Sequence, residues 1–103
     1  MIGSLRGVVA ERSLTGEILV EVGGIGYRVL VPISALPALE PGATVFLFTH
    51  QHVREDALIL FGFPTRDERD TFEALISASG VGPKLALAVL SVLQWGNSPT
   101  GDA

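Results

Sequence analysis

The hydrophobic periodicity of the chain changes at Thr65, and this change constrains the fold more than any other feature of the sequence. Before Thr65, short β-branched segments alternate with turn residues, a pattern typical of β-strands. After Thr65, apolar residues recur three and four positions apart, which indicates helices. With 103 residues, the chain is long enough for one small β domain followed by a helical segment.

The first domain, residues 1–63, is predicted to contain five short strands. The five strands are expected near residues 5–10, 18–22, 27–31, 43–50 and 57–63. A short helical or irregular connection is expected after the third strand, at residues 32–40. Five strands in so small a domain indicate a closed or nearly closed barrel of the OB-fold type, an architecture that often binds nucleic acids. A glycine-rich turn at residues 23–26 favours a hairpin. These glycines do not complete a G-x-G-x-x-G motif, so a dinucleotide site is excluded.

The second region, residues 64–93, is predicted to be a partial helical domain. Thr65 and Glu68 have the spacing of a capping box at the start of its first helix. The second helix is expected to begin at Pro83 and to end with the region. Its residues 85–90 are all apolar, so it should be buried on several sides. The chain supplies too little material for that burial, which indicates missing sequence or a partner subunit.

The reversal between the two predicted helices has a glycine-hydrophobic-glycine pattern, Gly80-Val81-Gly82-Pro83-Lys84. Glycines accept positive φ and, without a Cβ atom, let a phosphate approach the backbone. Pro83 suits the first position of a helix, whose free N–H groups and positive dipole end favour an anion beside Lys84. Gly80, Val81, Gly82 and Lys84 are therefore the expected phosphate contacts of a helix-hairpin-helix element. An ordinary helical hairpin with a glycine cap is the alternative that the motif alone leaves open.

The net charge of −4 argues against DNA binding, because nucleic-acid-binding domains usually carry a basic excess. However, six of the eleven acidic residues lie in the two short stretches 55–56 and 67–73. A locally basic face built from Arg54, Lys84 and Arg28 therefore remains compatible with the sequence.

Composition excludes several other classes of protein. The chain has no cysteine, so it forms neither a disulfide framework nor a thiolate metal site. No apolar run approaches the length of a membrane span, and the first residues lack the features of a signal peptide. We expect a soluble cytoplasmic protein without a membrane partner.

No catalytic motif is recognisable, and we expect no enzymatic activity and no cofactor. His50 and His52 share a strand face and are able to reach one ion, but the sequence suggests no third ligand. We interpret them as surface or turn histidines and predict no metal site. The last segment, residues 94–103, is rich in turn formers and is predicted to be flexible, with Trp95 incidental.

Four segments in the same order resemble the RuvA family of bacterial Holliday-junction-binding subunits: 1–7 (MIGSLRG), 22–27 (VGGIGY), 53–57 (VREDA) and 80–86 (GVGPKLA). The likeness runs to about Leu93 and covers the N-terminal part of the family. It implies an OB barrel, a helical domain with helix-hairpin-helix motifs, and a tetramer that holds an open four-way DNA junction. It also implies a further domain that engages the RuvB branch-migration motor.

The resemblance assigns roles to the second barrel hairpin. Glu55 and Asp56 match the acidic pin of the family, whose carboxylates repel the phosphates of continuous duplex and so supply selectivity. Arg54 beside the pin either contacts DNA or neutralises the two acids.

Neither a second glycine-hydrophobic-glycine segment nor the motor-binding domain has a counterpart here, and residues 94–103 do not look like family sequence. We therefore expect weakened junction binding and no coupling to RuvB. The leading hypothesis is a non-catalytic junction-binding module for recombination and repair. The alternative is a truncated, self-associating interaction module with weak or no DNA binding.

Overall fold

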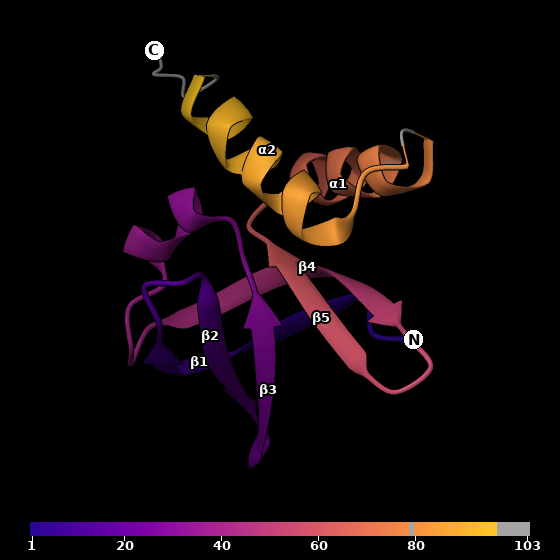
Figure 1. Cartoon of the computed structure of the whole chain (residues 1–103). Coiled ribbons are helices and arrows are strands. Elements are labelled where there is room, and N and C mark those ends of the chain that lie inside the picture. Colours follow the sequence, from indigo (N-terminus) through magenta and orange to yellow (C-terminus); the bar gives the residue numbers. More distant parts are fainter. Residues whose placement is uncertain (79, 97–103) are drawn as a thin grey trace.

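The computed structural model describes residues 1–78 and 80–96, and within them five strands form a closed barrel with the order β1-β2-β3-β5-β4 (Figure 1). The strands are β1 Ser4–Arg12, β2 Glu17–Val22, β3 Ile25–Leu30, β4 Thr44–Val53 and β5 Leu58–Phe63. This barrel, followed by helices, confirms the predicted OB-type fold with a helical segment. The connection expected after the third strand is a 3-10 helix, η1, Ile33–Ala38.

The barrel interior is filled by side chains that alternate along the strands and by side chains of η1 and its flanking residues. This core consists of Leu5, Val9, Ile18, Val20, Val29, Val31, Ala35, Leu36, Leu39, Leu47 and Leu60. Neighbouring strands are antiparallel except at the β3–β5 seam, where Val29 pairs with Leu60 and Leu30 with Phe61 in parallel register.

The β2–β3 hairpin turns through Gly23 and Gly24, whose φ angles are 57° and 88°. A two-residue turn with positive φ at both positions matches the right-handed twist of the strands that it joins. The predicted glycine-rich hairpin is therefore confirmed.

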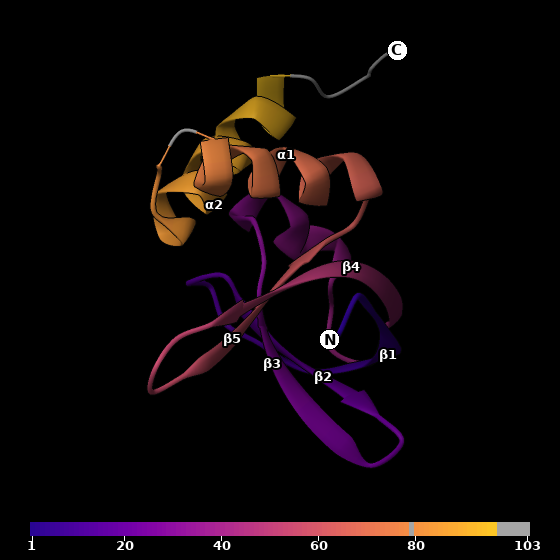
Figure 2. The same cartoon turned by 90° about the vertical axis from the view of Figure 1, so that its right-hand side faces the viewer.

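The two α-helices of the described chain, α1 Arg66–Ala78 and α2 Pro83–Gly96, lie on the same side of the barrel (Figures 1 and 2). Helix α1 begins as predicted, because the Oγ1 atom of Thr65 accepts the backbone N–H of Glu68 at 3.2 Å. A second apolar cluster joins the helices to the outer face of β5, and its buried members are Phe61, Phe63, Phe72, Ala86 and Leu90.

Helix α2 differs from the sequence expectation in length and in burial. It continues past Leu93 and ends at Gly96, a residue type that often ends helices. One face is buried through Ala86 and Leu90, but Leu85 is 60% exposed and Val92 is 69% exposed. The expected burial on several sides is therefore not provided by the described residues of this chain.

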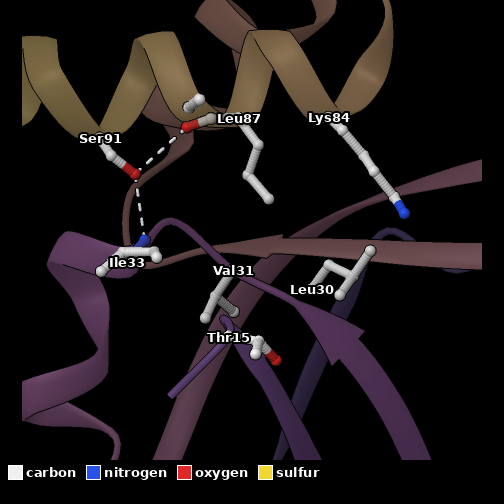
Figure 3. A pocket seen from close by; sticks show the side chains of 8 residues that line it. Thr15, Leu30, Val31, Ile33, Lys84, Leu87 and Ser91 are labelled. Carbon is white, nitrogen blue, oxygen red and sulfur yellow. Dashed lines mark hydrogen bonds between the residues drawn. The ribbon is translucent and has the colours of Figure 1, made fainter. Parts of the chain in front are cut away.

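Ser91 fastens α2 to the segment that follows β3. Its Oγ accepts the backbone N–H of Ile33 at 3.0 Å and donates to the carbonyl of Leu87 at 3.2 Å (Figure 3). The orientation of α2 on the barrel is thus fixed by a polar contact as well as by the apolar cluster. Neither described helix is long and apolar enough to cross a membrane. The predicted flexible segment began at Gln94, which was wrong for residues 94–96 because they form the last turn of α2. Its remainder, residues 97–103, and the side chain of Trp95 lie outside the described residues.

Candidate nucleic-acid interface

The connection between α1 and α2 has the geometry that the glycine pattern predicted, with one difference. Gly80 has a φ of 70°, in the left-handed region that favours glycine. The φ of Gly82 lies outside that region, so the reversal itself requires only Gly80 to be glycine. The side chain of Val81 packs against the second apolar cluster and leaves its backbone as the part able to meet a phosphate.

Gly82 occupies the N-cap position directly before α2, since its carbonyl accepts the backbone N–H of Ala86 at 2.9 Å. A Cβ atom at Gly82 would meet nothing within 4 Å. Neither the backbone angle nor crowding within the chain explains glycine here. Without a side chain at this position, the first N–H groups of α2 have no cap and are open to an external acceptor.

The second barrel hairpin places its acidic residues at the tip. The N–H of Arg54 donates to the carbonyl of Ala57 at 2.7 Å, which leaves Glu55 and Asp56 as the two residues of the turn. Both side chains are exposed. The structure therefore puts these two carboxylates in the turn between β4 and β5.

A groove of about 350 Å³ brings the hairpin and the α1–α2 connection together. Its walls combine residues from β4, β5 and the start of α2: His52, Arg54, Ile59, Phe61, Gly82, Pro83, Lys84 and Leu85. Of the predicted site residues, Arg54, Gly82 and Lys84 thus share one groove. Glu55 and Asp56 lie at the hairpin tip beside it and do not line it.

Residues 1–62 match the family described as RuvA N terminal domain. The chain belongs to the RuvA family. The matched region ends one residue before the last residue of β5, so it corresponds to the barrel.

Proteins named Holliday junction branch migration complex subunit RuvA are similar to the chain over most of its length. The one from Syntrophotalea carbinolica is 50% identical over 93 residues, which cover 90% of this chain and 47% of the relative. The one from Methylibium petroleiphilum is 52% identical over 100 residues, covering 94% and 50%. The one from Escherichia coli O1:K1 is 50% identical over 92 residues, covering 88% and 45%. The chain thus spans about half the length of these RuvA relatives.

The sequence indicated Arg28 only as part of a basic face, and the structure places it in a second groove. This groove of about 260 Å³ is lined by Arg28 and Lys84 together with Glu17. Lys84 therefore borders both grooves, with Arg54 on one side and Arg28 on the other. In Figure 3 the side chain of Lys84 extends from α2 toward the barrel strands.

His52 lines the groove, a position that sequence reasoning missed. Alternation along β4 puts His52 on the same face as Arg54, and this signal was available in the sequence. His50 has a different partner, since its Nδ1 atom lies 2.8 Å from Oε2 of Glu73 on α1. Within residues 1–78 and 80–96, no group of three or more His, Cys, Asp or Glu side chains is arranged to hold a metal ion.

Proposed function

We propose that this chain is the junction-recognising part of a RuvA-type subunit, and that it binds four-way DNA by shape and carries out no catalysis. The observation that carries the proposal is the groove shared by Arg54, Gly82 and Lys84 beside the exposed tip of Glu55 and Asp56. The name of the curated relatives supplies the kind of DNA.

The start of α2 supports a phosphate contact. The first N–H groups of a helix have no partners within the helix, and the helix dipole adds positive potential at the same point. Gly82 brings no side chain between these donors and an incoming phosphate. Lys84, the second residue of α2, adds a full charge, so a backbone phosphate would receive both hydrogen bonds and charge compensation. Such contacts position DNA without reading its bases.

The position of the cations answers the objection raised by the net charge of −4. Arg54, Lys84 and Arg28 border two grooves that meet at Lys84. Glu17 lies in the second groove and weakens the potential near Arg28. We therefore expect the strongest phosphate attraction between Arg54 and Lys84.

The exposed acids at the hairpin tip supply selectivity. A continuous duplex lying across the groove would bring its phosphates near Glu55 and Asp56, whose charges repel them. The strands of an open junction diverge and avoid the tip. The acids therefore reduce binding to the wrong DNA shape and add no affinity for the right one.

The proposal includes assembly. The family resemblance implies a tetramer around the junction and, in the complete protein, a contact with the RuvB motor. Because bacterial DNA lies in the cytoplasm, the proposed location is cytoplasmic.

Gel-shift competition tests the proposal. A labelled four-way junction is bound by the chain, and unlabelled junction or linear duplex of the same sequences is added at roughly 50 and 200 mM salt. We expect the junction to compete more strongly than the duplex at both salt concentrations. Equal competition by the two DNAs would show that the chain does not recognise junctions.

The exposed face of α2 favours a second candidate function, self-association without DNA binding. Leu85 and Val92 are 60% and 69% exposed on one helix. Sedimentation of the chain and of a Val92→Ser variant separates the two functions when it is run with and without junction DNA. A stable oligomer that requires Val92 and ignores DNA would favour self-association as the sole role.

A further inference from the structure

Two phenylalanines and three arginines form a second basic surface on the outer face of β1 and β4 and at the start of α1. We call Arg6, Phe46, Phe48, Arg66 and Arg69 the Arg–Phe patch. The Phe46 and Phe48 rings meet edge to face with centroids 5.0 Å apart. The guanidinium of Arg6 lies 5.0 Å from the Phe46 centroid, and those of Arg66 and Arg69 each lie 5.7 Å from the Phe48 centroid.

The arginines of the patch are held in place while most of their hydrogen-bond donors stay available. A guanidinium stacked on a ring keeps its N–H groups in its own plane, where a carboxylate is able to reach them. Arg69 already donates to Asp70 through Nε at 3.1 Å and Nη2 at 3.0 Å. Among the described residues, no ion pair involves Arg6 or Arg66, and both side chains are exposed.

The patch lies far from the proposed DNA groove. Arg66 and Arg69 occupy the first turn of α1, and the glycine connection follows its last turn, about 18 Å away along the helix. Phe46 is near the start of β4 and Arg54 follows its end, about 26 Å away along the strand. In Figure 2 the start of α1, where the chain enters the helix from β5, lies on the right, and the β4–β5 hairpin lies on the left. The patch therefore does not share the groove.

We propose that the Arg–Phe patch is a docking surface for an acidic, partly apolar peptide segment of a protein partner. The patch holds three of the seven basic residues of the chain. Asp70 pairs with Arg69, and Asp67 and Glu68 lie in the first turn of α1, so the positive charge offered to a carboxylate comes mainly from Arg6 and Arg66. Phe46 and the neighbouring Val8 are 38% and 41% exposed and offer apolar contact beside the cations.

The composition of the patch favours a protein over a nucleic acid. Aromatic residues and arginine are enriched in the cores of protein interfaces and among the residues that dominate binding energy. The Phe48 ring is flanked by the Phe46 ring and by the guanidinium groups of Arg66 and Arg69, so it offers little surface to a stacking base. This inference goes beyond the proposed DNA binding and does not depend on it.

The test uses the isotope-labelled chain and three probes in NMR titrations: a peptide of alternating aspartate and leucine, the matching lysine and leucine peptide, and linear duplex DNA. We expect the acidic peptide to shift the amide signals of Arg6, Phe46 and Arg66 in a saturable way. The lysine peptide should leave them unchanged, and duplex DNA should act first on Gly82 and Lys84.

Variants localise the effect. Arg6→Gln and Arg66→Gln should each weaken the acidic peptide by roughly threefold to fivefold, the scale of an exposed ion pair. Arg28→Gln makes the same change in charge outside the patch and should leave peptide affinity unchanged. Unfolding curves of the variants show whether each one is folded. Absence of saturable shifts at the patch, equal loss in Arg28→Gln, or stronger shifts there with duplex DNA would each overturn the proposal.

Discussion

His50 and Glu73 join the barrel to the helices, since Nδ1 of His50 on β4 lies 2.8 Å from Oε2 of Glu73 on α1. The same imidazole meets the ring of Phe72 edge to face, with centroids 5.5 Å apart. The Glu73 side chain is 43% exposed, whereas Phe72 is fully buried. A polar contact at the rim therefore accompanies an apolar contact in the interior, and the two should differ in their contribution to stability.

We predict that Phe72→Ala lowers the free energy of unfolding by about 3–5 kcal/mol, because it removes a buried ring that touches Phe61 and Phe63. Glu73→Gln should cost less than about 1 kcal/mol, since a partly exposed polar contact contributes little and the amide is still able to hydrogen-bond. Urea unfolding monitored by circular dichroism gives both values. A larger loss in Glu73→Gln than in Phe72→Ala would mean that the rim contact dominates.

Gly82→Ser separates the folding role of this residue from its binding role. Serine is at least as good as glycine at the start of a helix, and space is open at this position, so stability should be unchanged or slightly higher. The new hydroxyl would bond the first N–H groups of α2 and stand where a phosphate would approach. DNA affinity should therefore fall by roughly tenfold, the loss of about one charge-assisted hydrogen bond.

Gly80→Ala is the matched comparison for Gly82→Ser. It forces a Cβ atom onto a left-handed backbone and should cost about 1–2 kcal/mol of stability. Thermal unfolding and gel shifts are measured on both variants. A stable Gly82→Ser variant with unchanged DNA affinity would remove Gly82 from the interface.

Lys84 should act as a phosphate contact without sequence preference. Lys84→Gln should weaken junction and duplex similarly and lower the slope of log affinity against log salt by roughly one. Arg6→Gln removes one positive charge from the far side of the barrel and should leave that slope unchanged. Titrations at several salt concentrations measure the slopes, and equal slopes for Lys84→Gln and the unaltered chain would contradict the contact.

The acids of the hairpin tip should control selectivity. The double variant Glu55→Gln, Asp56→Asn keeps size and hydrogen bonding and removes two negative charges, so duplex binding should rise more than junction binding. Because exposed charges interact over about one Debye length, roughly 10 Å at 0.1 M salt, the difference should shrink as salt is raised. Competition gel shifts report the ratio. An unchanged junction-to-duplex ratio at low salt would make the tip an ordinary surface turn.

The sequence was informative wherever the local pattern and the tertiary structure agree. Alternating apolar residues gave the strands, Thr65 and Glu68 gave the start of α1, and Gly23 with Gly24 gave a turn. The pairing of Val29 with Leu60 was not predictable from the sequence, because a parallel contact between distant strands leaves no short-range signal.

Individual residues of the candidate site were predictable from the sequence. Their arrangement in one groove was not. The glycine pattern indicated Gly82 and Lys84, and the family resemblance indicated Arg54. That these residues line one groove with His52 depends on how α2 packs against β5. The exposure of Leu85 was also unpredictable, because an unbroken apolar run does not reveal which side another element covers.

The closure of the barrel has a consequence for the order in which the chain folds. Hairpins between neighbouring strands form from local contacts, but the described β3–β5 seam joins residues on either side of η1 and β4 through two residue pairs. Contacts between distant segments form late, because loop closure costs entropy before they contribute stability. The seam should therefore form after the local β2–β3 hairpin and open before it, and amide hydrogens there should exchange with solvent before those of the β2–β3 ladder. On the β5 side of the seam, Phe61 also packs against the helices. A ligand that binds α2 and the barrel together would therefore slow the opening of the seam.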